Sequence, residues 1–242
     1  MISWKTIGIA ASICLLFVMT VGQFLDKELP FGIEGQAAED LTERIEQSIN
    51  KDGWDKTGIV AWTFAGGRHI WDRNRKLHEY KRGEKRIQHS LNNRAGRVFQ
   101  SGHWKKINPG SRLEQMAWDS WINDSFWLNP LSKLRDEGVK RALVGKNQLL
   151  VTYTAGGNTP GDSYVWTIDE DGRPTDWALW VSVIPIGGLS CTWESWVQLD
   201  TGAWIATTHD WGGFKLKLTE LEGAYKWEEL FEDDPFEGFD SE

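Results

Sequence analysis

Cysteine is scarce in this chain of 242 residues, and its two cysteines, Cys14 and Cys191, lie far apart. Because Cys14 belongs to an apolar N-terminal run, Cys191 has no partner for a disulfide within the folded part. The spacings H-x-x-x-H and C-x-x-C do not occur, and the sequence predicts neither a metal site nor a cofactor. Ser163 is not part of a G-x-S-x-G motif, so the nucleophile elbow of a hydrolase is not indicated either.

Tryptophan, in contrast, is abundant, with 16 residues in a chain that is 40% hydrophobic. The length and composition are sufficient for one domain with a sizeable core. Trp177 and Trp180 are three residues apart, and so are Trp193 and Trp196. Residues three apart on a β-strand point to opposite faces of the sheet. Both faces of the predicted sheet must therefore accommodate indole rings.

Charge is unevenly distributed along the chain, whose formal net charge is −8. Residues 68–106 contain twelve Lys and Arg against three acidic residues, whereas residues 228–242 contain eight acidic residues and no Lys or Arg. The basic segment has three possible roles: a solvated strand face, a surface for anionic headgroups, or a docking site for the acidic tail. Nucleic acid is not expected as a partner, because the N-terminus predicts export.

That N-terminus contains 20 uncharged residues, "TIGIAASICLLFVMTVGQFL" (6–25), which is long enough to cross a bilayer as a helix. Lys5 precedes the run, while Asp26 and Glu28 flank Lys27 after it, which predicts that the N-terminus stays inside. We expect an uncleaved signal anchor. A cleaved signal peptide and a buried core helix are the alternatives. The first two place the body outside the cytoplasm.

The rest of the chain reads as a series of short elements separated by turns. A linker (26–37) is followed by an amphipathic helix at about 38–51 and by short alternating segments that predict an antiparallel meander. Ser111 and Glu114 form a capping box for a helix that Pro130 ends, and a shorter helical piece at 131–138 follows. A second meander completes the body. We therefore divide the chain into an anchor (1–25), the linker (26–37), a folded domain (38–224) and an acidic tail (225–242) that is disordered or loosely docked.

The predicted fold class is α+β. A single strongly curved antiparallel sheet, a half-barrel, carries helices on its concave side and is preceded by the N-terminal transmembrane helix. This layout resembles the periplasmic lipoprotein-carrier and outer-membrane lipoprotein-sorting superfamily, in which an open β-barrel covered by helices holds acyl chains. The resemblance covers residues 38–224 and rests on element order, aromatic content and the export segment. Two stretches, "NDSFWLNPLSKLRDEG" and "GGNTPGDSYVWTIDEDGRPTDWALW", also resemble segments of uncharacterised bacterial envelope proteins.

The resemblance implies a bacterial inner-membrane protein with a single span and its body on the periplasmic side. It also implies an apolar cavity, although family carriers are usually soluble or lipid-anchored and no partner-binding residue can be transferred to this chain. Aromatic residues of the predicted strands are the candidates for the cavity lining: Trp62, Phe64, Tyr153, Trp166, Trp180 and Trp196. Basic residues of the first meander are the candidates for binding a headgroup or another anion: Arg68, Arg73, Lys81 and Arg86.

These observations predict binding of a lipid or an acylated protein in the cell envelope, without catalysis. The alternative is a structural protein with a solid core that docks an envelope partner through its basic face or its acidic tail. An enzyme would require His209, Asp162 and Ser163 to converge, but Asp and Ser at turns usually serve local hydrogen bonds. The four histidines of residues 68–106 are expected on a solvated strand face.

Overall fold

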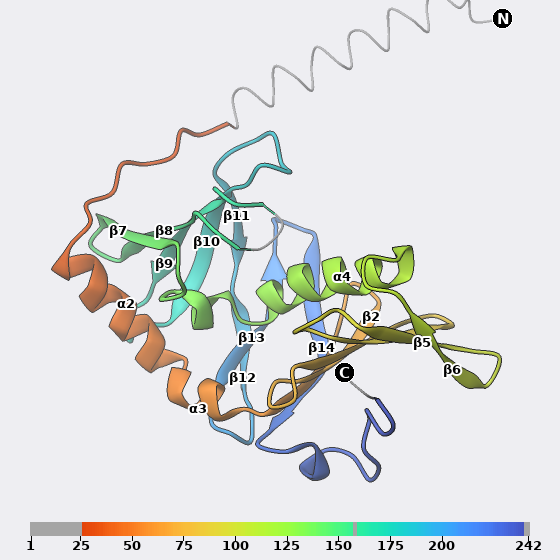
Figure 1. Ribbon diagram of the computed structural model, residues 1–242. Helices are drawn as coiled ribbons and strands as arrows, with labels where there is room; N and C mark the ends of the chain where they lie inside the picture. Colours follow the sequence, from red (N-terminus) through yellow and green to blue (C-terminus); the bar gives the residue numbers. More distant parts are fainter. Residues whose placement is uncertain (1–25, 157–158, 240–242) are drawn as a thin grey trace, which may run out of the picture.

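The computed structural model describes residues 26–156 and 159–239, which form two antiparallel β-sheets and a few helices (Figure 1). The large sheet contains, in spatial order, β12 (Glu194–Gln198), β13 (Trp204–Asp210), β14 (Lys215–Ala224), β1 (Ile59–Phe64), β2 (Gly67–Asp72), β3 (Leu77–Arg82), β4 (Lys85–Ser90), β5 (Gly96–Gln100) and β6 (His103–Ile107). The small sheet contains β11 (Leu189–Thr192), β10 (Pro174–Trp180), β9 (Ser163–Ile168), β8 (Gln148–Tyr153) and β7 (Val139–Gly145).

The prediction of a single curved α+β half-barrel is therefore wrong, because the described residues are mostly β and their strands divide between two sheets. The division falls between β11 and β12, inside the predicted second meander. β11 and β12 follow each other along the chain, but Trp193 between them pairs its backbone N–H with Thr175 O at 2.7 Å. Ser195 then adopts a positive φ of 57°. This local bend sends the chain from the small sheet into the large one.

The helices cover the two sheets separately. α2 (Gln36–Ser48) packs against β7 and β8, and α4 (Arg112–Leu128) crosses β3, β4 and β13. The predicted helix 38–51 ends early because Asn50, in the left-handed conformation, accepts a hydrogen bond from Gly53 N and starts α3 (Lys51–Lys56). The predicted α4 is confirmed, with Ser111 as its cap. The piece expected at 131–138 is a short 3-10 helix, η1 (Pro130–Lys133).

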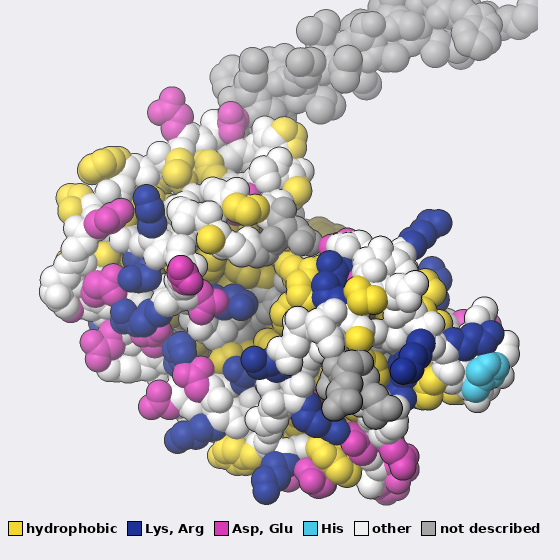
Figure 2. Space-filling view, viewed as in Figure 1, with side chains coloured by type: hydrophobic (Ala, Val, Ile, Leu, Met, Phe, Trp, Pro, Cys, Tyr) yellow, Lys and Arg dark blue, Asp and Glu magenta, His cyan; other side chains and the backbone are white. Residues whose placement is uncertain are grey.

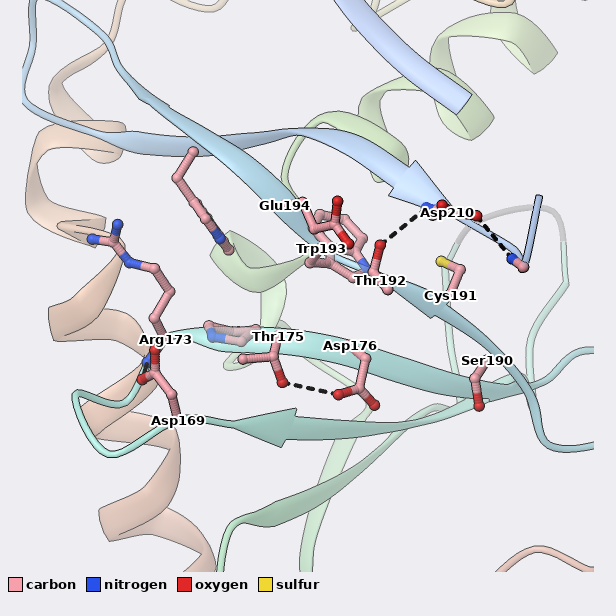
Figure 3. Close-up of a pocket in the computed structure, with 13 residues that line it drawn as sticks. Asp169, Arg173, Thr175, Asp176, Ser190, Cys191, Thr192, Trp193, Glu194 and Asp210 are labelled. Carbon is pink, nitrogen blue, oxygen red and sulfur yellow. Dashed lines mark hydrogen bonds between the residues drawn. The ribbon is translucent and has the colours of Figure 1, made fainter. Parts of the chain in front are cut away.

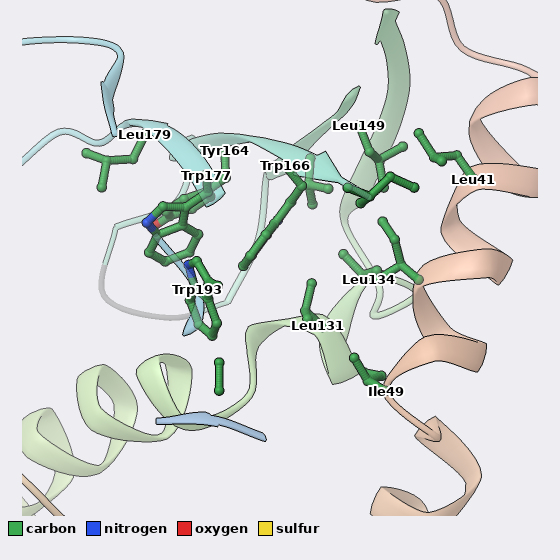
Figure 4. Close-up of a cluster of buried hydrophobic side chains, with 14 of the residues drawn as sticks. Leu41, Ile49, Leu131, Leu134, Leu149, Tyr164, Trp166, Trp177, Leu179 and Trp193 are labelled. Carbon is green, nitrogen blue, oxygen red and sulfur yellow. The ribbon is translucent and has the colours of Figure 1, made fainter. Parts of the chain in front are cut away.

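Aromatic and aliphatic side chains fill the space between the elements. Below the small sheet, Leu41, Ile45 and Ile49 of α2 pack near Trp166 and Trp177 (Figure 4). A second cluster below the large sheet includes Trp62 and Phe64 of β1 together with Leu128, Ile205 and Leu218. The paired tryptophans divide as the alternation requires, since Trp177 and Trp193 are buried while Trp180 and Trp196 are half-buried.

The described part of the acidic tail is ordered. After the 3-10 helix η2 (Trp227–Glu229), the tail lies on the outer face of β3–β5, which is the face opposite α4. Asp234 pairs with Arg75 at 2.7 Å, and Phe236 is only 2% exposed. Gln88 donates to Pro235 O, and Arg97 donates to the carbonyls of residues 237 and 238. Docking of the tail on the basic segment, one of the three possible roles of that segment, is what the structure shows.

Within the described residues, no helix combines the length and the apolar character needed to span a membrane. The anchor predicted at 1–25 lies outside those residues. The predicted transmembrane helix, signal anchor and single-pass inner-membrane location are corrected accordingly, since the described structure gives them no support.

Candidate functional site

A cleft of about 750 Å³ opens where the two sheets separate (Figure 3). One wall is formed by β10 and the turn before it, including Arg173 and Asp176. β11 continues this wall as far as Trp193, and the opposite wall is formed by β12 and the end of β13, including Trp196 and Asp210. The bend at Trp193 separates the walls, because β11 pairs with β10 while β12 pairs with β13. The cleft is thus a direct consequence of the strand that changes sheets.

The floor of the cleft is aromatic. Trp193 is 2% exposed, and its ring packs edge-on against Trp166 and Trp177, with centroids 5.0 Å apart in both pairs. Trp196 is half-buried, and the Arg173 guanidinium lies over its ring at 5.3 Å. Ring pairs of this kind are stabilised beyond the area that they bury. The floor is therefore a rigid apolar surface that continues into the core of the small sheet.

The rim of the cleft is acidic, with four carboxylates and one arginine. Two of the carboxylates serve local turns: Asp169 accepts from the backbone of Asp171 and Arg173, and Asp210 accepts from Gly212 N and Gly213 N. The Gly213 N–H, together with Lys215, holds the pKa of Asp210 below its usual value. The other two, Asp176 and Glu194, come from opposite walls and make no ion pair within the described residues.

Cys191 forms part of the cleft wall but is not an activated thiol. Its sulfur lies 2.7 Å from the indole nitrogen of Trp177, which donates to it. Burial raises the pKa of Cys191 to about 12, so the thiol is protonated at neutral pH. A thiolate is the nucleophilic form, and it is favoured by cationic and exposed surroundings that Cys191 does not have. We therefore assign Cys191 to packing.

Behind the floor, the aromatic core extends to α4 through Trp127. The ring of Trp127 lies 5.2 Å from Trp177 and 5.2 Å from His209. His209 is fully buried, and neither of its ring nitrogens has a hydrogen-bond partner within the described residues. Burial lowers its pKa to about 4, which keeps the ring neutral at pH 7.

Figure 2 shows the surface hollowed between the two halves of the molecule, with hydrophobic side chains at the edge of the hollow.

A second polar feature lies under α4, where three histidines of neighbouring strands form a hydrogen-bonded chain. His69 Nδ1 lies 3.0 Å from His78 Nε2, and His78 Nδ1 lies 2.8 Å from His89 Nε2. Carboxylates of α4 close both ends, with Asp124 at 2.9 Å from His69 Nε2 and Glu114 at 3.3 Å from His89 Nδ1. All three rings are fully buried, so the expectation that they lie on a solvated face is wrong.

The hydrogen-bonded chain of histidines needs one proton more than three neutral imidazole rings supply. It contains four hydrogen bonds, and each neutral ring donates only one N–H. Burial lowers the pKa of His78 and, to about 4, that of His89, so both rings are neutral. Glu114 accepts two hydrogen bonds from Arg94 and one from Gly110 N.

The aromatic candidates for the cavity lining do not converge on one cavity. Trp62 and Phe64 belong to the core of the large sheet, whereas Tyr153 and Trp166 belong to that of the small sheet. Trp180 is outside both and donates to Lys27 O at 2.7 Å. Trp196 is the one candidate that lines the cleft. Trp193 was missed, although its spacing from Trp196 was the available indication that the two face different surroundings.

The basic candidates are partly engaged by the protein itself. Arg68, Lys81 and Arg86 lie side by side across β2, β3 and β4, on the face opposite α4. Arg86 pairs with Glu79 at 2.9 Å, and Arg68 donates to Glu220 O at 2.6 Å. Arg73 lies apart from this row, at the β2–β3 turn, where it donates to Thr57 O at 2.6 Å. None of the four lines the cleft.

The structure does not assemble a catalytic triad from the residues considered in the sequence. Asp162 accepts from Thr159 Oγ1 and Ser182 N, and the Ser163 hydroxyl lies 2.8 Å from Thr152 Oγ1. No hydrogen bond within the described residues joins either of them to His209. Asp162 and Ser163 thus serve the local turn and the strand pairing.

Comparison with known proteins gives limited information. No protein-family model and no curated protein matches the chain. A solved structure of a DUF1329 family protein from Desulfovibrio piger ATCC 29098 is similar over 81% of this chain and 100% of that chain, with a TM-score of 0.42 and 11% sequence identity. A likeness this low assigns neither a family nor a function. The resemblance to lipoprotein carriers therefore stays a prediction, and the mostly-β architecture is what is established.

Proposed function

We propose that this chain binds the apolar part of an amphiphilic ligand, a lipid or a lipid-modified partner, in the cleft between β10–β11 and β12–β13. The observation that carries the proposal is the aromatic floor of Trp193 and Trp196 inside a cleft of about 750 Å³. Ligand pockets are typically apolar and aromatic, of about 300–1,000 Å³, with a few polar groups that fix orientation. Each methylene that an acyl chain buries on this floor contributes about 0.8 kcal/mol.

The acidic residues at the rim of the cleft determine which charge the polar group of the ligand can carry. Asp176 and Glu194 would repel an anionic headgroup seated at the cleft mouth, so a neutral or cationic polar group fits better. Selection of an anionic headgroup by Arg68, Lys81 and Arg86 is not part of this proposal, because that row lies on a different face. Binding here needs no chemistry, which agrees with the protonated thiol of Cys191.

The proposal is tested by removing the one half-buried indole of the cleft. Trp196→Ala should weaken binding of a fluorescent fatty amine or fatty alcohol about 10-fold, corresponding to about 1.4 kcal/mol of lost apolar contact. Trp180→Ala is the matched control, because Trp180 is also half-buried and lies outside the cleft. Both variants are checked by circular dichroism. Unchanged binding by a folded Trp196→Ala protein would exclude the cleft as the ligand site.

The second candidate function is docking of a protein partner through the basic face or the acidic tail. One observation favours it: the tail and the basic face bind each other through Arg75 and Asp234, so this face accepts an acidic peptide. A partner at the same place would have to displace the tail.

A further inference from the structure

A second pocket, of about 360 Å³, lies at the β2–β3 turn where α4 meets the large sheet. Arg73 and Lys76 come from the turn, Trp71 from β2 and Trp121 from α4. The two indoles meet edge-on at 5.5 Å. The pocket is thus a basic recess with an aromatic back wall, and it is separate from the cleft.

Arg73 is held rigidly in this pocket. Its Nη1 donates to the carbonyls of Trp54 and Thr57, and its guanidinium lies over the rings of Trp54 and Trp71 at 4.4 and 5.4 Å. These contacts engage Nη1 and the flat face of the group. They leave Nε and Nη2, the pair of donors that binds carboxylate and phosphate groups in a bidentate manner.

The positive charge of Arg73 is not compensated by an ion pair. No carboxylate within the described residues lies within 4.0 Å of its nitrogens, and Lys76 has no ion pair either. The one carboxylate that lines the pocket, Asp55, is already bound to Lys51 at 2.7 Å. Burial lowers the pKa of Arg73, and the charge of the nearby Asp55 only partly opposes this shift. A partly buried cation of this kind is stabilised by an anion.

A further donor in the same pocket lacks an acceptor. The indole N–H of Trp121 is buried and has no hydrogen-bond partner within the described residues. Two cationic side chains that make no ion pair within the described residues, those of Arg73 and Lys76, therefore line one recess beside the Trp121 ring. The Asn74 side chain closes its edge by donating to Tyr225 O at 3.1 Å.

We propose that this pocket binds an oxyanion, a phosphate or carboxylate group, between Arg73, Lys76 and Trp121. The group can belong to a small free anion or to the headgroup of an acidic lipid, because the chemistry of recognition is the same. The site does not depend on the apolar cleft, which lies elsewhere on the molecule.

Lys76 offers a variant that separates binding from folding. It adopts a positive φ of 56°, a conformation that is unfavourable for lysine and that asparagine tolerates better. Lys76→Asn should therefore leave the melting temperature unchanged or raise it, while it removes one of the two cations. Lys85→Asn is the matched control, because Lys85 is an exposed lysine at the start of β4, beside another hairpin turn.

The experiment titrates inorganic phosphate into the full chain at constant ionic strength, with chloride as the reference, and follows the melting temperature and tryptophan fluorescence. We expect phosphate to raise the melting temperature more than chloride does and to change the fluorescence of Trp71 and Trp121. Lys76→Asn should weaken phosphate binding at least 5-fold, whereas Lys85→Asn should leave it unchanged. Arg73→Gln should abolish it.

Two further arms distinguish the sources of the anion. Retention of the chain on phosphatidylglycerol vesicles, but not on phosphatidylcholine vesicles, with loss in Lys76→Asn, assigns the site to a lipid headgroup. Binding of inorganic phosphate without vesicle retention assigns it to a free anion. The proposal is overturned if phosphate acts no differently from chloride, or if the Lys76→Asn and Arg73→Gln proteins are folded and bind phosphate like the native chain.

Discussion

Two fully buried histidines of this protein have opposite surroundings. His78 uses both ring nitrogens in the hydrogen-bonded chain, whereas neither nitrogen of His209 has a partner within the described residues. A buried polar atom without a partner costs about 1–3 kcal/mol of stability, and replacing it by an apolar group of the same shape removes that cost. The same residue type therefore stabilises one site and weakens the other.

The same substitution at the two positions tests this difference. His78→Phe should lower the free energy of unfolding by about 2–4 kcal/mol, because it leaves facing nitrogens of His69 and His89 unpaired. His209→Phe should leave the stability unchanged or raise it by up to about 1 kcal/mol, because its ring packs against aromatic neighbours such as Trp193, at 4.2 Å, and Phe keeps this packing. Urea unfolding measures both. Equal losses would mean that the nitrogens of His209 are engaged.

At the scale of the element, α4 is attached to the large sheet by carboxylates as well as by apolar side chains such as Ala117 and Leu128. Its fully buried side includes Glu114 and Ala117, while Trp118, Ile122 and Phe126 on its flank are only half-buried. Glu114 and Asp124 are ten residues apart, which is about 15 Å along the axis of α4. They can therefore reach both ends of the hydrogen-bonded histidine chain, which crosses three strands. The histidines therefore determine where α4 rests.

This attachment predicts that the fold loses stability in mild acid. In the unfolded chain a histidine has a pKa near 6.5, whereas burial lowers the pKa of His89 to about 4 and that of His78 well below 6.5. Between pH 6.5 and 4 the unfolded chain binds more protons, so stability is complete above pH 6.5 and falls as the pH falls through this window. Asp124 and Glu114 on α4 and Arg94 on the β4–β5 turn are the other charged groups facing the chain.

From pH 7 to 5 we expect His89 to reduce the free energy of unfolding by about 2 kcal/mol, and His78 to act in the same direction. Thermal melts as a function of pH measure the effect. His209, whose pKa burial also lowers to about 4, adds a similar contribution, so His209→Phe should show a shallower pH dependence. His103→Asn is the control, because His103 is exposed and should not change it. A melting temperature that does not change with pH over this range would contradict the conclusion that these buried histidines are neutral in the folded protein.

The elements themselves could be predicted where local chemistry decides them. Ser111 and Pro130 define α4, and Gly66, Gly83 and Gly102 at positive φ mark hairpin turns. The histidine chain could not be predicted, because β3 is covered by α4 on one face and by the tail near the other and so shows no alternation of burial. Glu114 likewise reads as a capping residue, whereas its side chain binds the distant His89 and Arg94.

At the scale of the whole molecule, the division into two sheets was the feature that sequence alone missed. Trp193 and Ser195 lie within a stretch of strand-forming residues, and no proline or glycine marks the bend between them. The bend exists because the aromatic core of the small sheet holds Trp193 while β12 continues toward β13. Packing of distant rings, rather than a local turn, therefore creates the cleft that we propose as the ligand site.

The docked tail gives the last test, which also separates the two candidate functions. Deletion of residues 230–242 should lower the melting temperature by about 10 °C, because it removes the buried Phe236 and leaves Gln88 and Arg97 without their tail carbonyls. A synthetic peptide of residues 228–242 should then bind the shortened chain in trans and restore part of the loss. An Asp234→Asn peptide should bind more weakly than an Asp233→Asn peptide, since Asp234 is the residue that pairs with Arg75.

The effect of the peptide on the cleft then distinguishes the functions. If the basic face serves a partner, acidic peptides unrelated to the tail should also bind the shortened chain. A ligand bound in the cleft should not change the affinity of these peptides. If the tail is purely structural, its own peptide alone should bind, because Phe236 and the Arg75–Asp234 pair require a defined sequence spacing. In that case docking of an acidic partner on the basic face is excluded.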